Sequence, residues 1–223
     1  MFKKTIFSKL VAIFVIILLV AFSVAGIILN IFLGGYVTAE KANNLEKSCD
    51  DINLVFSNYT KLLDLDREFA KEYLEDYIDA YAESYRSLVW IVDQDGYIRF
   101  SSPPFPALYY ERYGDETGLI KLPDARQYRD VMRRSGKLRM TGDFYGFFNG
   151  TGSGGRSYDS SWLTVAKSYE YLSRGETVFI AVYMHTPAPE VNRARHDVIR
   201  LFLFSAGTAV VISVVLVYIF SLR

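Results

Sequence analysis

Two short segments of this sequence contain residue types that could bind phosphate or a metal ion. The first, GTGSGG at residues 150–155, has the glycine content of a phosphate-binding loop. It lacks the following Gly-Lys-Ser/Thr, and no helix is predicted directly after it. The second, DQDG at residues 93–96, begins as a calcium loop does but lacks the later ligands, including the glutamate at the twelfth position. We therefore predict a flexible loop at 150–155 and a tight turn at 93–96.

Histidine and cysteine are too sparse to predict a catalytic or metal centre. His185 and His196 are the two histidines of the chain, and their separation is not that of a metal-binding pair. No Ser/His/Asp or Cys/His set is recognisable, so we expect no catalysis, no metal and no cofactor in these residues. The lone Cys49 is expected to be a reduced or buried thiol, with a disulfide between two copies as the alternative.

An acidic helix face offers one further way to bind a ligand. Its carboxylates would repel one another and could be neutralised by a divalent ion or a cationic peptide. They recur within residues 66–87, at Glu72, Glu75, Asp76, Asp79 and Glu83. The alternative, which we favour, is an ordinary solvated face.

Both ends of the chain are strongly apolar. Residues 10–33 contain no charged side chain and only Ser23 and Asn30 as strongly polar ones, and residues 201–222 also lack charge. A helix needs about 20 residues to cross the hydrocarbon core of a bilayer, and each run exceeds that length. We predict two transmembrane helices. A cleaved signal peptide is the alternative for the first run, but the apolar stretch continues well past the small-x-small site at 23–25.

The charges beside these runs predict their orientation. Lys3, Lys4 and Lys9 precede the first run and Arg223 follows the second, which places both termini in the cytoplasm. The segment between the runs holds all 25 acidic residues and no basic tract that would indicate nucleic-acid binding. The predicted plasma-membrane protein has a cytoplasmic N-terminus at 1–9, a transmembrane helix at 10–33, an extracytoplasmic domain at 34–200, a transmembrane helix at 201–222 and a cytoplasmic stub at 223.

Helical periodicity predicts two helices at the start of the central segment. After an expected break at Gly34-Gly35, apolar residues recur every three or four positions over 38–63, which predicts a stalk helix leaving the membrane. A second amphipathic helix is predicted over 66–87, with the acidic residues largely opposite an apolar stripe. The members of this stripe are Phe69, Tyr73, Tyr77, Ile78, Tyr81 and Tyr85.

Strand patterns follow the helices. The segment VWIVDQDGYIRFSS, residues 89–102, predicts a β-hairpin at the edge of a sheet, ended by the prolines at 103, 104 and 106. A short helix is predicted at 123–135, a strand at 137–144 and a loop at 149–157. Strands at 162–169 and 177–185 form a closing hairpin, with Val178, Ile180, Val182 and Met184 on one face. A helix beginning at Ala188 or Glu190 then runs into the second apolar segment.

With these elements in place, the chain resembles the N-terminal sensor half of bacterial transmembrane sensor histidine kinases that have an extracytoplasmic PAS-like domain of the Cache, or PDC, type. The resemblance rests on VWIVDQDGYIRFSS and on SWLTVAKSYEYLSRGETVFIAVYMHTP, residues 161–187, which is similar to the family's closing hairpin. It implies an α+β fold, an antiparallel PAS-like single-Cache sheet with N-terminal helices, flanked by two transmembrane helices. In this family a HAMP linker and kinase domains follow the second span, so any kinase activity would belong to parts other than residues 1–223.

The resemblance also implies a ligand pocket on the distal side of the sheet, lined by its strands and by the variable segment between the hairpins. Aromatic walls with one or two cations would suit a small carboxylate or another anion. The residues that these elements offer are Tyr109, Tyr110, Arg112, Tyr128, Arg133, Lys167, Tyr169, Tyr183 and His185. The alternative for each is a place in the core, in an interface or in solvent.

The expected function is that of a membrane-anchored sensory input module of a two-component receptor. An unknown small molecule, envelope ligand or stress would bias two arrangements of the domain, and the helix at 189–222 would slide or rotate to report it. A homodimer is expected from small residues at intervals of four in both membrane segments, Ser205, Ala209 and Ser213, and Ala21 and Ala25. The rivals are the same module feeding a chemotaxis or cyclic-nucleotide output, and a stand-alone membrane protein that binds an envelope partner.

Overall fold

The computed structural model describes residues 6–122, 131, 136–144, 147, 162–173 and 176–221. The chain divides into two compact units, one formed by Met1–Val37 with Asn192–Arg223 and the other by Thr38–Val191. Two long helices contribute to the first unit, α1 (Ile6–Leu62) and α5 (Ala188–Ser221). Both are long and apolar enough to cross a membrane, with mean hydropathies of 3.1 and 2.2 in the most apolar parts of Ala12–Leu62 and Arg195–Leu216.

Within the first unit, α1 and α5 contact each other through an aromatic pair and a polar clamp. The rings of Phe22 and Phe202 meet edge to face, with their centroids 6.5 Å apart. The guanidinium group of Arg195 donates two hydrogen bonds to Oδ1 of Asn30, at 3.0 and 2.6 Å. These contacts pair the two apolar helices at two levels along their length.

The break expected at Gly34-Gly35 is absent, because α1 continues through both glycines to Leu62. A glycine in a helix interior costs only about 1 kcal/mol relative to alanine. The sequence TAEKANNLEK that follows, residues 38–47, contains strong helix formers and extends the helix on the C-terminal side. The helix predicted over 38–63 is therefore confirmed, as the second part of a single continuous helix.

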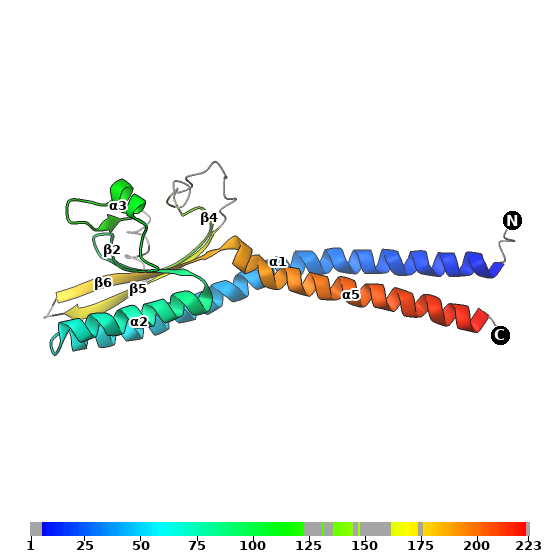
Figure 1. The fold of residues 1–223 in the computed structure, drawn as a ribbon, viewed down its shortest axis with the longest axis horizontal. Helices are drawn as coiled ribbons and strands as arrows, with labels where there is room; N and C mark the ends of the chain where they lie inside the picture. The colour runs from blue at the N-terminus through cyan, green and yellow to red at the C-terminus, as the bar shows by residue number, and fades with distance from the viewer. Residues whose placement is uncertain are drawn as a thin grey trace. The chain divides into compact units, whose positions relative to one another are not determined.

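The second unit is an α+β domain built on one six-stranded antiparallel sheet of order β3-β2-β1-β6-β5-β4 (Figure 1). Its strands are β1 (Leu88–Asp93), β2 (Tyr97–Ser102), β3 (Ile120–Lys121), β4 (Lys137–Gly142), β5 (Trp162–Ser173) and β6 (Glu176–Pro187). Both predicted hairpins are confirmed, but the first does not form the sheet edge. β1 pairs with β2 on one side and with β6 on the other. An interior position suits a strand whose four residues 89–92 are all buried, on both faces of the sheet.

The turn predicted at 93–96 is confirmed. Gly96 has a φ of 89°, a conformation that glycine adopts without the strain of a side chain. Oδ1 of Asp93 accepts hydrogen bonds from the backbone N–H groups of Asp95 and Tyr97, at 3.0 and 2.9 Å. The carboxylate thus stabilises a β-hairpin turn.

Helix α2 (Arg67–Tyr85) begins where it was predicted, but the face that it buries overlaps the predicted stripe only in part, with Ile78 as the shared buried residue. Oδ1 of Asp66 caps its first turn by accepting hydrogen bonds from the N–H groups of Glu68 and Phe69. The buried positions are the small or aliphatic residues Ala70, Leu74, Ile78 and Ala82. The aromatic stripe lies beside them, and Phe69 is 54% exposed. Alanine at two of these four positions lets the helix approach the sheet closely.

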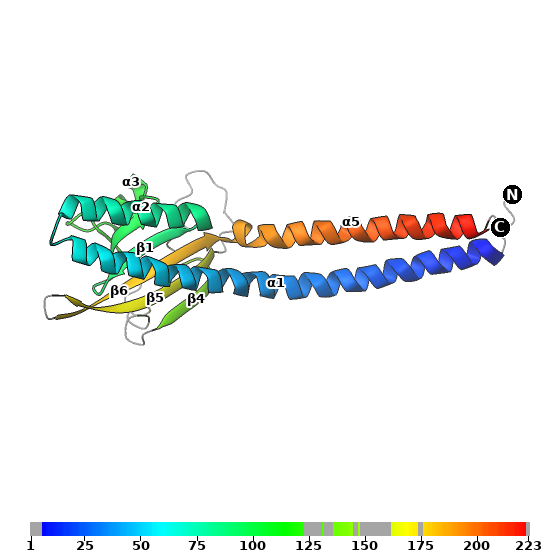
Figure 2. The same ribbon diagram turned by 90° about the horizontal axis from the view of Figure 1, so that it is seen from below.

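The two faces of the sheet are covered by different elements. Residues 38–62 of α1 lie side by side with α2 on one face (Figure 2), where Leu45, Cys49 and Ile52 are fully buried. The opposite face has α3 (Ala107–Tyr113) and a second core cluster. That cluster consists of Trp90, Val92, Ile98, Tyr109, Ile120, Leu122, Val131, Phe144, Phe147, Ala166, Ala181 and Tyr183.

The remaining predicted elements lie partly inside and partly outside the described residues. The helix predicted at 123–135 lies outside the described residues except for Val131, as does the loop predicted at 149–157. The strand predicted at 137–144 is confirmed as β4, and α5 begins at Ala188 as expected. Helix α3 and the two-residue strand β3 were not predicted.

Candidate functional site

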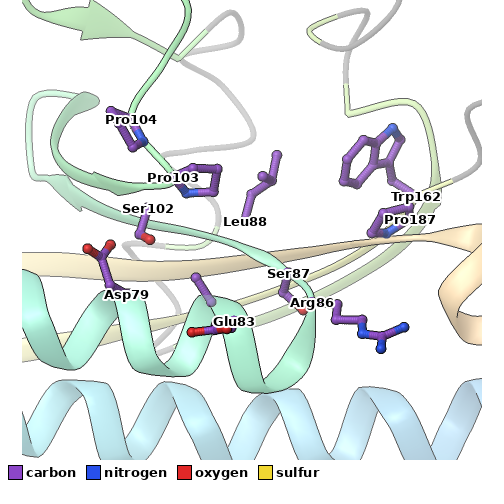
Figure 3. Close-up of a pocket in the computed structure, with 11 residues that line it drawn as sticks. Asp79, Glu83, Arg86, Ser87, Leu88, Ser102, Pro103, Pro104, Trp162 and Pro187 are labelled. Atoms are coloured by element: carbon purple, nitrogen blue, oxygen red, sulfur yellow. The ribbon is translucent and has the colours of Figure 1, made fainter.

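A cavity of about 460 Å³ lies between the C-terminal half of α2 and the start of the β2–α3 connection (Figure 3). We call it the α2 groove. Its lining residues are Asp79, Ala82, Glu83, Arg86, Ser87, Leu88, Ser102, Pro103, Pro104, Trp162 and Pro187. A second cavity of about 380 Å³ shares Asp79 and Pro104 with it and is otherwise lined by Glu75, Ile78, Arg99, Phe100, Ser101 and Tyr110. Cavities of this size accommodate small organic ligands.

Local structure holds the walls of the α2 groove in place. Helix α2 ends at Arg86, which adopts the left-handed conformation, with a φ of 48°, and turns the chain directly into β1. The hydroxyls of Ser87 and Thr186 are hydrogen-bonded at 2.6 Å, and both residues are buried. This bond joins the end of α2 to the end of β6, so the groove and the last strand are mechanically connected.

The groove is polar at one end and apolar at the other. Figure 3 shows Asp79 beside Ser102 at one end, and Trp162 with Pro187 at the other. Asp79 and Glu83 lie one turn apart on α2, and both are exposed. Among the described residues, neither of these carboxylates forms an ion pair. The groove therefore presents negative charge to solvent.

A row of polar contacts connects α1 to strands β4 and β5 on the helix-covered face. Glu46, which is buried, accepts hydrogen bonds from Nζ of Lys137 at 3.0 Å and from Nε of Arg139 at 2.5 Å. The hydrogen bond from Arg139 lowers the pKa of Glu46 below its ordinary value, and burial offsets part of this effect. One turn further along α1, Asp50 pairs with Lys167 and accepts a hydrogen bond from the hydroxyl of Tyr169. These contacts fix the register of α1 on the sheet.

On the opposite face, His185 is enclosed by aromatic rings. It is fully buried, Nδ1 is 2.8 Å from the hydroxyl of Thr164, and its ring centroid lies 4.0 Å from that of Trp90 and 5.0 Å from that of Phe144. Burial lowers the pKa of His185 to about 3, so the ring is neutral at physiological pH. A neutral imidazole has one N–H donor and one nitrogen acceptor, and here the ring acts as a core residue with Nδ1 hydrogen-bonded to Thr164.

The predicted pocket residues do not lie around one cavity, because the sheet separates them. Lys167 pairs in register with Val182, and Ala166 pairs with Tyr183. Paired residues share a face, so Lys167 and Tyr169 face α1 while Tyr183 and His185 face the aromatic cluster. A single pocket lined by all of the predicted residues is therefore excluded, and binding of an anion by part of the set stays a prediction.

The remaining predicted residues are dispersed. Tyr109 is buried in the aromatic cluster, and Tyr110 is 44% exposed and lines the second cavity. Arg112 belongs to α3, but its side chain lies outside the described part of the structure. Tyr128 and Arg133 also lie outside it.

Sequence reasoning missed the α2 groove. Two of its wall residues, Pro103 and Pro104, were expected only to end the first hairpin. The one available signal was the i, i+4 spacing of Glu75, Asp79 and Glu83, for which a solvated face was favoured over binding of a divalent ion or a cationic peptide. No group of three or more His, Cys, Asp or Glu residues in the described ranges could hold a metal ion.

Comparison with known proteins leaves the family open. No protein-family model matches this chain, and no curated protein matches it in sequence. Among solved structures, the PAS domain of BvgS from Bordetella pertussis matches 55% of this chain and 94% of that chain, with 10% sequence identity and a TM-score of 0.26. A superposition this loose carries no argument about function, which must come from the arrangement of the residues themselves.

Proposed function

We propose that this chain is a membrane-anchored sensory input module, in which the second unit receives a signal and α5 passes it across the membrane. The main support is the junction of β6 and α5, since β6 ends at Pro187 and α5 begins at the next residue, Ala188. β6 is an interior strand, paired with β5 along its whole length and with β1 over residues 180–185. Because no flexible linker separates strand from helix, movement of the strand's end would be transmitted and not absorbed.

The finer features of this proposal follow the resemblance described above. We propose that the second unit is a Cache-type PAS-like domain outside the plasma membrane, that both termini are cytoplasmic, that two copies associate and that the output is a two-component pathway. Binding and transmission, and not catalysis, would be its role. Two alternative functions remain. One is the same module with a chemotaxis or cyclic-nucleotide output, and the other is a stand-alone membrane protein that binds an envelope partner.

Coupling between β6 and α5 can be tested in the full chain in lipid nanodiscs, with a spin label at Val198→Cys in α5. Val198 is 40% exposed, whereas the native Cys49 is fully buried and need not be removed before labelling. Thr186→Val removes the hydroxyl that binds Ser87 at the α5 end of β6. Thr177→Val, at the far end of β6, is the matched control because residue 177 is exposed.

A sensory module predicts that Thr186→Val changes the electron paramagnetic resonance line shape at position 198 and that Thr177→Val leaves it unchanged. An unchanged line shape in Thr186→Val, in a sample whose thermal stability has fallen, would reject the coupling. Orientation is tested separately with a membrane-impermeant maleimide on whole cells. Thr177→Cys should react in intact cells, and Lys9→Cys only after permeabilisation.

A further experiment separates the receptor from the stand-alone membrane protein. An antibody to residues 34–200, used on native membranes, should detect a protein well above the 25.5 kDa of this chain if it is the input part of a receptor. A band at that mass would favour a protein that acts through an envelope partner.

A further inference from the structure

We propose that the α2 groove binds a small organic cation with an apolar body, such as an aryl-alkyl ammonium or guanidinium ion. This ligand would be the signal of the sensory function proposed above, and the inference rests on that function in this one respect. The site differs from the distal face of the sheet that the resemblance indicated, and its ligand is a cation, whereas an anion was expected at that face.

The polar end of the groove has an unused hydrogen-bonding group. Ser102 is only 4% exposed and lines the groove, and no hydrogen bond joins its hydroxyl to another of the described residues. The hydroxyl points toward α2, beside Asp79 (Figure 3). The oxygen itself is not among the fully buried side-chain atoms that lack a partner, so it is open to the groove, where water or a ligand can reach it. An ammonium group placed between Ser102 and Asp79 would donate to both.

The charge of the groove selects a cation. Asp79 and Glu83 have no ion-pair partner in the part of the chain that the structure describes. Arg86 also lines the groove, but its side chain extends away from Glu83 (Figure 3). In the adjoining cavity, the charge of Arg99 is compensated by Asp93, with Nε 2.5 Å from Oδ2. The carboxylates of Asp79 and Glu83 would therefore repel an anion and attract a cation.

The other end of the groove selects an apolar body. Leu88, Trp162 and Pro187 form its wall, and all three are only partly exposed. Apolar groups gain free energy by covering such surface, and the indole face also attracts cations. A ligand that contacts Pro187 would touch the residue immediately before α5. Binding of a ligand in the groove would therefore change the contacts at the start of α5.

A bare divalent ion fits the groove less well than an organic cation. Metal ions such as calcium need several oxygen ligands around one point. Among the described residues, no group of three His, Cys, Asp or Glu side chains is arranged for this. A metal ion would also leave the apolar wall uncovered, whereas an aryl-alkyl ammonium ion would use both ends of the groove.

The test measures binding of phenethylammonium to the full chain in nanodiscs at neutral pH by isothermal titration calorimetry. The neutral 2-phenylethanol and the anionic phenylacetate keep the apolar body and change only the charge. We expect phenethylammonium to bind at least about tenfold more tightly than either. Equal affinity for the three compounds, or no heat of binding for phenethylammonium, would overturn the proposal. Displacement of phenethylammonium by an equal concentration of Mg²⁺ would also overturn it, in favour of a metal ion.

Variants with matched charge changes locate the site. Asp79→Asn with Glu83→Gln should weaken binding about tenfold or more, while Glu72→Gln with Asp76→Asn, on the same helix but outside the groove, should leave it unchanged. Equal losses in the two double variants would mean that the acidic face as a whole attracts the probe, and would overturn the assignment. Ser102→Ala should also weaken binding without loss of fold, because its hydroxyl forms no hydrogen bond with another of the described residues.

The spin label at Val198 separates this proposal from the sensory function on which it rests. Binding of phenethylammonium at the groove with an unchanged label would uphold the ligand and reject the sensory function. Absence of binding, together with a changed label in Thr186→Val, would reject the ligand and uphold the sensory function.

Discussion

Glu46 provides the most direct test of how α1 is held on the sheet. Its side chain is buried, and it accepts charge-assisted hydrogen bonds from Lys137 and Arg139 on β4. The two cations are 58% and 43% exposed, so water can solvate them when the carboxylate is removed. Hydrogen bonds to charged groups contribute about 1.5–3 kcal/mol each when well buried, and exposed ion pairs contribute less than about 1 kcal/mol. We therefore expect Glu46→Ala to lower the free energy of unfolding by about 2 kcal/mol and Glu46→Gln by about 1 kcal/mol.

The pH dependence of this loss has a definite sign. Because the pKa of Glu46 in the folded state lies below its ordinary value of 4.5, the charged side chain stabilises the fold at neutral pH. As the pH falls through 4.5, the unfolded chain binds the proton first, and the contribution decreases until it is lost below the pKa of the folded state. The stability difference between wild type and Glu46→Gln should be constant above about pH 5.5 and should shrink below pH 4.5.

Thermal unfolding of the full chain in nanodiscs, followed by near-ultraviolet circular dichroism, measures this difference. For a domain of this size, 1 kcal/mol corresponds to a shift in Tm of about 2–4 °C, so Glu46→Ala should melt about 4–8 °C lower. Glu40→Gln, at an exposed position of the same helix, is the control and should have no effect. A gap between wild type and Glu46→Gln that is as large at pH 3.5 as at pH 7 would refute the electrostatic explanation. A double-mutant cycle with Arg139→Gln should show coupling between the two residues.

Three further outcomes follow from burial and packing. Burial raises the pKa of the Cys49 thiol, so a thiol reagent at pH 8 should leave it unmodified until the protein is unfolded, and fast modification of the native protein would contradict this. A side chain at Gly26 would lie 3.1 Å from the ring of Phe202, so Gly26→Leu should reduce energy transfer between dyes on α1 and α5, whereas Gly35→Leu, with open space around it, should not. Because the pKa of His185 is lowered to about 3, the stability of the wild type should fall by up to about 1.4 kcal/mol per pH unit as the pH decreases from 6.5, and His185→Phe should lack this dependence in denaturant titrations.

Local patterns in the sequence were sufficient for most elements of the fold. The Asp-Gly turn and its flanking apolar runs predicted the first hairpin, and Asp66 lies at the N-cap of α2. The register of the closing hairpin, which follows from the sequence, also places the predicted pocket residues on opposite faces of the sheet. Ser173 pairs with Glu176 across two residues, and counting back along both strands pairs Lys167 with Val182. Lys167 and Tyr183 therefore belong to opposite faces by register alone.

The face that α2 buries could not be read from periodicity, and here the tertiary structure decided. Periodicity predicts a helix with an apolar side, but Phe69 and Tyr77 lie on a stripe adjacent to the one that contains Ala70 and Leu74. The choice depends on how closely the helix backbone can approach the sheet, and small side chains allow the closer approach.

The α2 groove also depends on the tertiary structure, because its walls come from segments far apart in the chain. Asp79 and Glu83 come from α2, Ser102 from the end of β2, and Trp162 and Pro187 from the two strands of the closing hairpin. Each of these residues has an ordinary local explanation, as part of a solvated helix face or as a strand end. Nearest-neighbour patterns determine helices, strands and turns, since these depend on contacts within a few residues. Which side chains meet at a site depends on long-range packing, and that exists only in the folded chain.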